Sequence, residues 1–270
     1  MATIDGTSLD FRLLDRLSEG HSAIHRLDPR AKVLATLFFL VSVVSFGKYE
    51  VSALFPFFLY PAALIALADL PALFLVRKTA LVLPFAAVIG IFNPLLDSRI
   101  LLHVGPLAIS GGWISCASII VRAALTVSAA FILVSVTGFP SICAALERLG
   151  MPRTFAVQLL FLYRYIFVLI EEGKRMSLAR ELRTFGGRGP GMKHFGSLVG
   201  HLLLRTWERA ERIHRAMLAR GFTGEFHPRR PCRFGAWETL YLLGWSALFL
   251  LFRLENIPRI LGTLVAGVLE

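Results

Sequence analysis

Long apolar runs separated by short polar stretches follow one another along most of the chain. A helix needs about 20 apolar residues to cross roughly 30 Å of hydrocarbon. Four runs approach that length in the first half, a fifth follows a polar middle part, and a short apolar tail ends the sequence: 31–46, 51–67, 79–96, 113–139, 236–252 and 257–269. The pattern predicts an all-α, polytopic membrane protein with about five to six transmembrane helices.

The third run shows where its helix should begin and end. A short apolar stretch, 71–76, precedes it and ends at two basic residues, and Pro84 interrupts the run itself. Asn93 and Pro94 close the run, and we expect a helix break there because proline cannot continue a helix. Irregular backbone at membrane depth can also line an ion site, which is the alternative for this pair. Residues 97–103 are expected to form a loop.

Composition excludes several protein classes. Hydrophobic residues make up 56% of the chain and charged residues 17%, whereas soluble domains have about 45–50% and about 25%. A soluble nucleic-acid-binding protein and a disordered chain are therefore excluded, and no nucleic-acid partner is expected. The three Cys are widely spaced and include no Cys-x-x-Cys motif, so a disulfide scaffold is not indicated either.

The net charge of +11 is concentrated in one block. Residues 174–233 contain 14 Lys and Arg against four Glu, a net charge of +10. A basic block beside apolar spans is typical of the cytoplasmic side of a membrane. The block is also suited to contact anionic lipid headgroups.

Residues 155–170 decide the topology. They are apolar, but Gln158 and Arg164 interrupt them, and an Arg at a helix centre costs about 2.5–3.5 kcal/mol on insertion. A span here would place the basic block outside if the N-terminal segment, which has no secretory signal, is cytoplasmic. We therefore expect 155–170 to pack in the interface or against other helices. The predicted parts are a cytoplasmic N-terminal segment, transmembrane helices, a cytoplasmic helical domain, and a last transmembrane helix with its tail: 1–30, 31–139, 140–233 and 234–270.

Two helix ends inside the basic block resemble each other. Residues 179–185 and 216–222 share the pattern Ala-x-x-(Leu/Ala)-Arg-(Thr/Gly)-Phe, 37 residues apart. The second follows an amphipathic helix pattern over 201–222, and Gly221 suits a helix stop. Two interpretations of Arg183 and Arg220 stay open. Each side chain either hydrogen-bonds the last carbonyls of its helix or reaches into an acidic or carbonyl-lined groove of a partner, for which the planar guanidinium is suited.

Several motifs taken together carry a resemblance to a known family. They are Ser-Ala-Ile-His-Arg-Leu-Asp-Pro-Arg-Ala-Lys at 22–32, Phe-Asn-Pro-Leu at 92–95, Leu-Glu-Arg-Leu-Gly-Met-Pro at 146–152, Tyr-Arg-Tyr at 163–165, Glu171-Glu172 and the paired Arg motifs. The chain resembles the transmembrane T component of energy-coupling factor (ECF) transporters, and more closely the cobalt/nickel type. The residues that carry the family motifs are Asp28, Pro29, Arg30, Asn93, Pro94, Glu147, Gly150 and Pro152.

The resemblance implies a non-catalytic subunit of an ATP-driven importer in the cell (inner) membrane. Its implied partners are two ABC ATPase subunits, which hold ATP and Mg²⁺, and a separate substrate-binding membrane subunit; a small accessory membrane subunit is compatible with it. The chain itself then needs no cofactor. Cobalt uptake is the implied function, and a T component of a nickel or vitamin importer is the alternative.

The resemblance also assigns the paired Arg motifs to ATPase coupling. Arg220 matches the second coupling signature fully. Arg183 is followed by Thr184 where the signature has Gly, so Arg180 is a rival anchor in the first. The residues implied in coupling are therefore Ala179, Arg180, Arg183, Ala219, Arg220 and Gly221.

Ordinary structural roles compete with functional ones at several positions. Asp28 and Pro29 suit the start of the first span as helix cap and first helical residue. Arg122 is expected to extend its side chain to an interface. Glu171 and Glu172 are expected to pair with Lys174 or Arg175 on adjacent helix turns.

The sequence does not favour an enzyme. The seven His form no metal-ligand pattern, so no metal site is predicted. The sequence contains no Walker A motif and no nucleophile motif, so no catalytic residue is predicted. An enzyme acting on lipid phosphates would need carboxylates for Mg²⁺, and the basic block contains no Asp.

Overall fold

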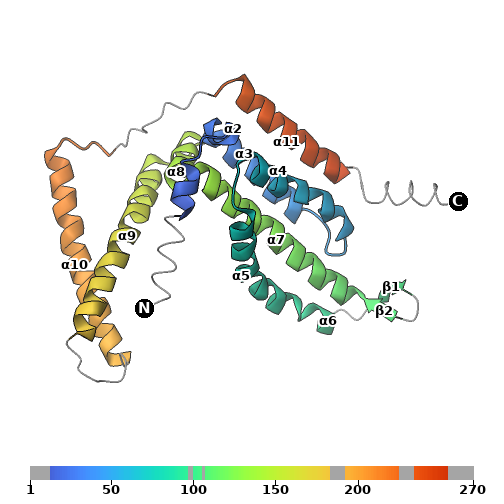
Figure 1. Cartoon of the computed structure of the whole chain (residues 1–270), viewed down its shortest axis with the longest axis horizontal. Coiled ribbons are helices and arrows are strands. Elements are labelled where there is room, and N and C mark those ends of the chain that lie inside the picture. The colour runs from blue at the N-terminus through green and yellow to red at the C-terminus, as the bar shows by residue number, and fades with distance from the viewer. Residues whose placement is uncertain (1–12, 97–99, 105–106, 183–191, 225–233, 255–270) are drawn as a thin grey trace. The chain divides into compact units, whose positions relative to one another are not determined.

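The structure is a computed structural model that describes residues 13–96, 100–104, 107–182, 192–224 and 234–254. The chain divides into two compact units. One unit comprises Leu14–Ile142 with Cys232–Glu270, and the other comprises Cys143–Pro231 with Met1–Leu13. We call them the α3–α7 unit and the α9–α10 unit after their principal helices (Figure 1).

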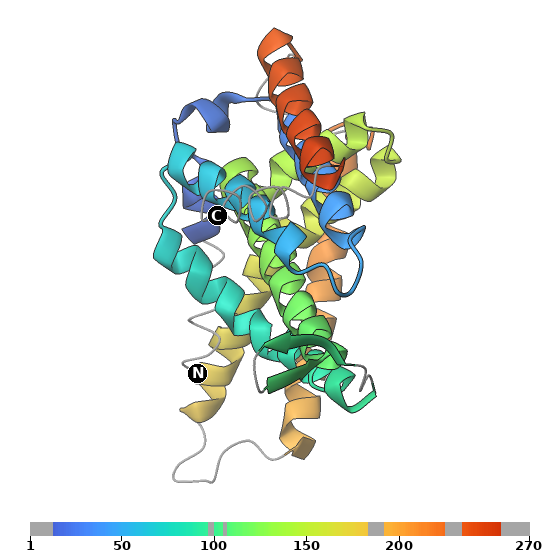
Figure 2. The same cartoon turned by 90° about the vertical axis from the view of Figure 1, so that its right-hand side faces the viewer.

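Helices form nearly all of the α3–α7 unit. The helix α5 (Ala72–Gly90) lies beside α7 (Gly111–Thr137), and Gly90 at the end of α5 allows close contact with Cys116 near the start of α7 (Figure 2). The other elements of this unit are α2 (Ala23–Arg26), α3 (Pro29–Val44), the 3₁₀-helix η1 (Ser52–Phe58), α4 (Leu59–Leu67), α6 (Asn93–Leu96), β1 (Ile100–Val104), β2 (Leu107–Ser110) and α11 (Ala236–Leu254).

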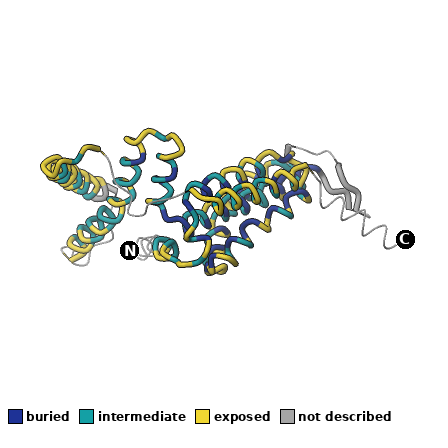
Figure 3. The backbone as a smooth tube through the Cα atoms, turned by 90° about the horizontal axis from the view of Figure 1, so that it is seen from above, coloured by how far each residue is buried: buried dark blue, intermediate teal, exposed yellow. Residues whose placement is uncertain are grey.

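Aromatic rings fill the centre of this unit. Phe39 of α3 stacks on Tyr60 of α4 with ring centroids 4.7 Å apart, and Phe249 of α11 contacts these rings at 5.4 and 5.2 Å. Phe57 of η1 and Leu125 of α7 are fully buried in the same core. Lipid tails are as apolar as these side chains, so in a bilayer the close packing of rings and helices holds the core together. Figure 3 shows this buried centre in dark blue and the more exposed α9 and α10 in teal and yellow.

Asp28 begins α3 as expected from the sequence. Its Oδ1 accepts a hydrogen bond from the Arg30 backbone N–H at 2.9 Å, and Pro29 occupies the first helical position. The capping interpretation of Asp28 and Pro29 is confirmed. One turn later the side chain of Lys32 is buried, and its Nζ lies 3.5 Å from the carbonyl oxygen of Val136 near the end of α7. The start of α3 is thereby tied to the end of α7.

A helix break beside Asn93 and Pro94 is confirmed, but it comes just before this pair, which begins the next helix. The helix α5 ends at Gly90, the short helix α6 begins at Asn93, and Asn93 Nδ2 donates a hydrogen bond to Ser115 Oγ at 3.0 Å. The start of α7 approaches this break so closely that a Cβ on Gly112 would lie 2.4 Å from Pro94 Cα. The amide of Asn93 thus holds the break against α7.

Two expectations about this region were wrong. Residues 71–76 and the start of the third run form one continuous helix, α5, which passes through Pro84. A proline costs a helix one hydrogen bond, and packed membrane helices tolerate that loss. The segment expected to be a loop at 97–103 instead contains β1, which pairs antiparallel with β2 in the register Leu102–Ile109 and Val104–Leu107. The Gly-Pro sequence at 105–106 is a turn signal. Among the residues that the structure describes, the all-α expectation holds except for these two strands.

Within the described ranges, three helices are long and apolar enough to cross a membrane: α5, α7 and α9 (Arg153–Glu181). The apolar helical segment Ser52–Leu67 is shorter. Residues 155–170, which the sequence interpretation kept out of the membrane, belong to the 29-residue helix α9. Its length and composition permit a span, so the membrane topology of this segment and the total of five to six spans stay predictions.

Candidate functional site

The turn that leads into α9 is built by Glu147, Gly150 and Pro152, which belong to one family motif. The helix α8 (Phe139–Arg148) is terminated by Gly150, whose φ of +113° is a left-handed conformation that favours glycine. The Met151 N–H donates to the Leu146 carbonyl at 3.1 Å, and the Gly150 N–H donates to the Glu147 carbonyl at 3.2 Å. These two bonds define a Schellman motif. Pro152 then caps α9.

A second Schellman motif ends α10 (Met192–Ala219). Gly221 has a φ of +77°, the Phe222 N–H donates to the Met217 carbonyl at 3.0 Å, and the Gly221 N–H donates to the Leu218 carbonyl at 3.0 Å. The helix stop predicted at Gly221 is confirmed. Arg220 is the last residue before the glycine, so the motif fixes its backbone at the very end of the helix.

The guanidinium of Arg220 is available to a partner. Arg220 is exposed, and among the described residues its side chain makes no ion pair or hydrogen bond. The Met217 and Leu218 carbonyls are satisfied by backbone N–H groups. In the part of the chain that the structure describes, the Arg220 side chain therefore makes no hydrogen bond to the last carbonyls of its own helix. Ala219, beside it, is also exposed.

The first Arg motif is described only in part. The helix α9 ends at Glu181, and the Leu182 N–H donates to the Leu178 carbonyl at 3.0 Å. Ala179 is exposed, whereas Arg180 is half-buried and already engaged in an interaction. Arg183 lies outside the described residues.

The helices α9 and α10 contact each other through an ion pair and an apolar groove. Arg205 Nη1 of α10 lies 2.7 Å from Glu172 Oε1 of α9. A groove of about 570 Å³ lies beside this pair. Its apolar lining comes from Tyr165, Val168 and Leu169 of α9 and from Leu203, Trp207, Ala210 and Ile213 of α10. The α10 members are the apolar stripe that the sequence pattern predicted.

The expected pairing of the two adjacent glutamates is half right. Glu171 Oε2 lies 4.0 Å from Arg175 Nη2, one turn along α9, as predicted. Glu172 instead pairs with Arg205, which is 33 residues away. Arg205 lies within the amphipathic pattern over 201–222, and spacing along one helix gives no signal for a contact between two helices. Within the described ranges, no group of three His, Cys, Asp or Glu side chains could hold a metal ion.

Comparison with known proteins decides the family. The family model CbiQ, described as "Cobalt transport protein", matches residues 20–232, which include both the Asp28 motif and the Arg220 motif. The chain belongs to this family. It is therefore a T component of an ECF transporter: a multi-pass membrane protein and a non-catalytic subunit. The resemblance carried by the motifs is confirmed at the level of the family.

Individual relatives are distant. The chain is 26% identical over 227 residues to the energy-coupling factor transporter transmembrane protein EcfT of Leuconostoc gelidum. The match covers 78% of this chain and 83% of the relative. It is 28% identical over 212 residues to an uncharacterized protein of Methanocaldococcus jannaschii, covering 75% and 72%. The cobalt transport protein CbiQ of Salmonella typhimurium matches at 29% over 108 residues, covering 39% and 48%.

Proposed function

We propose that this T component transmits ATP-driven motion of two ABC ATPase subunits to a separate substrate-binding membrane subunit of an importer. The observation that carries the proposal is the exposed guanidinium of Arg220, held at the end of α10 by a Schellman motif. Because the helix end is held by these hydrogen bonds, the position of the Arg220 backbone is fixed. The planar, permanently charged guanidinium can form several directed hydrogen bonds with an acidic or carbonyl-lined groove.

The helix α10 is suited to carry a displacement away from that contact. Its 28 residues span about 42 Å at 1.5 Å per residue. The pair between Arg205 and Glu172 joins it to α9. A push on Arg220 would therefore move α10 and, through this pair, α9.

Arg183 supplies the contact with the second ATPase in this proposal. Two similar Arg motifs fit two similar ATPase subunits. The motifs are 37 residues apart, and each follows its own helix pattern in the sequence. Arg180, the rival, is half-buried and engaged in another interaction, which favours Arg183. The other basic residues of 174–233 are proposed to meet anionic headgroups.

The test is to replace these arginines in the full chain, co-expressed with the candidate ATPases and the substrate-binding subunit. Arg183→Ala with Arg220→Ala should abolish uptake and weaken co-purification of the ATPases, while membrane insertion stays normal. Arg180→Ala separates the two candidate anchors. Arg215→Ala is the matched control, because Arg215 is exposed on α10 and pairs with Glu211 on its own helix. Wild-type uptake and ATPase co-purification in the double variant would overturn the proposal.

Cobalt is the proposed cargo. The family description and the Salmonella typhimurium relative, both named for cobalt transport, support it. Cells that carry the complex should take up radiolabelled Co²⁺, with Ni²⁺ as the competing ion. Uptake of neither ion would contradict the cargo without contradicting the coupling role.

A vitamin or nickel importer is the second candidate. The EcfT relative of Leuconostoc gelidum is matched over 83% of its length, compared with 48% for the Salmonella typhimurium relative. Co-purification with the tagged chain separates the candidates. A dedicated complex should yield one kind of substrate-binding subunit, whereas a shared T component should yield several.

A further inference from the structure

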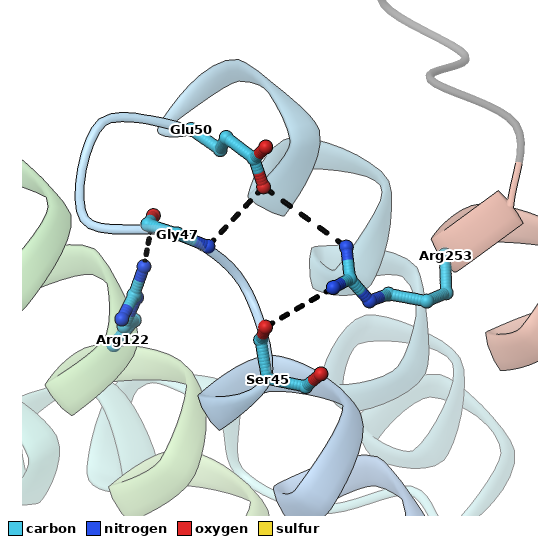
Figure 4. Close-up of polar contacts among 5 residues, drawn as sticks. All are labelled: Ser45, Gly47, Glu50, Arg122 and Arg253. Carbon is cyan, nitrogen blue, oxygen red and sulfur yellow. Dashed lines mark hydrogen bonds and ion pairs between the residues drawn. The ribbon is translucent and has the colours of Figure 1, made fainter.

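Two arginines from different helices meet the loop between α3 and η1 (Figure 4). Arg122 of α7 donates a hydrogen bond from Nη2 to the Gly47 carbonyl. Arg253, near the end of α11, donates from Nη2 to the Ser45 carbonyl at 3.1 Å. The sequence suggested only that Arg122 extends towards an interface, and it gave no reason to connect Arg122 with Arg253.

The cluster carries more positive than negative charge. Glu50 is its carboxylate: Oε2 accepts a hydrogen bond from the Gly47 N–H at 3.2 Å and lies 4.0 Å from Arg253 Nη1. Arg122 has no carboxylate partner within the described ranges, and its Nε is buried without a hydrogen-bond partner. The loop thus brings together two guanidinium groups and one carboxylate, and that carboxylate pairs with Arg253 alone. The guanidinium of Arg253 also lies 4.5 Å from the ring centroid of Phe46, and its side chain remains 40% exposed.

Exposed apolar side chains flank the cluster on two helices. Val41 and Val44 on the last turns of α3 are each 63% exposed, and Leu250 and Leu254 lie on the last turns of α11 at 54% and 76%. Such exposed apolar side chains are suited to face hydrocarbon in a multi-pass membrane protein. The Arg253 guanidinium lies where α3 and α11 end. Charged side chains in membrane proteins are usually paired with another polar group, so an anion would complete the surroundings of the two guanidinium groups.

We propose that the Arg122–Arg253 cluster binds the phosphate headgroup of an anionic phospholipid. A guanidinium has five N–H donors, and the hydrogen bonds that the structure shows use only part of them. Phosphate accepts such donors in a bidentate geometry. The acyl chains would lie along the exposed faces of α3 and α11. These faces favour a lipid over a free phosphate ion. The bound lipid would link α3, α7 and α11 at the end away from Asp28.

The proposal is tested with the full chain purified in an uncharged detergent. Binding of phosphatidylglycerol to the protein is titrated and followed by native mass spectrometry. Diacylglycerol with the same acyl chains and inorganic phosphate are tested as separate probes. Phosphatidylglycerol should bind best. Arg122→Gln with Arg253→Gln should weaken it on the order of tenfold, because both charge-assisted contacts are lost. Arg77→Gln is the matched control, because Arg77 is exposed on α5 and its side chain makes no ion pair or hydrogen bond within the described ranges.

A second variant keeps the test decisive if the double variant fails to fold. Glu50→Gln removes the carboxylate that competes for Arg253, so it should strengthen phosphatidylglycerol binding, while Arg253→Gln alone should weaken it. Equal binding by wild type, Glu50→Gln and Arg253→Gln would overturn the proposal. Diacylglycerol binding as strong as phosphatidylglycerol would exclude a phosphate site. Complete competition by inorganic phosphate at equal concentration would exclude a lipid as its ligand.

Discussion

Arg205 of α10 lies 2.7 Å from Glu172 of α9, measured between Nη1 and Oε1. The Glu172 side chain is only 20% exposed, whereas that of Arg205 is 64% exposed. The carboxylate side of the pair is therefore largely shielded from solvent, and both residues line the apolar groove. This is the polar connection through which a displacement of α10 would reach α9.

A double-mutant cycle with Glu172→Gln and Arg205→Gln measures the strength of this connection. We expect a coupling energy of about 0.5–1 kcal/mol, since the pair is short but only partly shielded. The pair between Arg212 and Glu208 is the control, because it lies within α10, is 3.9 Å long and is exposed on both sides. Its coupling energy should be smaller, at most about 0.5 kcal/mol. Equal coupling in the two cycles, measured by unfolding in detergent, would show that the groove adds nothing.

Replacing Gly221 should weaken the end of α10. Its φ of +77° costs a residue with a Cβ about 1–2 kcal/mol. A Cβ there would meet no atom within 4 Å, so Gly221→Ala should destabilise the α10 end through backbone strain alone. Gly200→Ala is the control. Gly200 also has open space around a Cβ, but it lies inside α10, so alanine should stabilise the helix by roughly 0.5–1 kcal/mol. Hydrogen exchange of the last turn of α10 reports both effects, and equal protection in the two variants would contradict the strain argument.

The helix ends could be predicted because their causes are local. Asp28 before Pro29, Asn93 before Pro94, and Gly221 after Arg220 each act on the nearest turn of backbone, and the structure confirms all three. Pro84 looked like another break. It is not one, because the loss of one hydrogen bond is tolerated when the rest of the helix is packed.

Contacts between helices could not be predicted for the opposite reason. Glu172 meets Arg205, and Arg122 and Arg253 meet on one loop, only because the helices that carry them are packed together. Spacing along a single helix predicts pairs such as Glu171 with Arg175 and nothing beyond them. The sequence therefore indicated the Arg220 end but not the pair that joins α10 to α9.

Gly112→Ala should disturb the contact between the start of α7 and the break at Asn93. A Cβ on Gly112 would lie 2.4 Å from Pro94 Cα and 2.7 Å from the Asn93 carbonyl oxygen. Backbone atoms cannot move aside cheaply, so we expect a loss of about 1–3 kcal/mol in the free energy of unfolding. Gly173→Ala in α9 is the control, since a Cβ there meets nothing within 4 Å. A thermal midpoint for Gly112→Ala that equals the control value would contradict the close approach.

His25 should make the stability of the α2 region depend on pH. Its Nε2–H donates to the Leu17 carbonyl at 3.0 Å, so Nδ1 accepts from the Ser22 hydroxyl at 2.7 Å. Burial lowers the pKa of His25 below its ordinary value of 6.5; the positive charge of Lys32 and the nearby His21 lower it further, against the opposing effect of the Leu17 hydrogen bond. The unfolded chain therefore binds the proton more readily, and stability is full above pH 6.5 and falls as the pH drops below it. Thermal midpoints of wild type and His25→Gln should converge between pH 7.5 and 5.5. A difference that stays constant over this range would show that His25 has the same pKa in the folded and the unfolded chain, which would contradict the prediction.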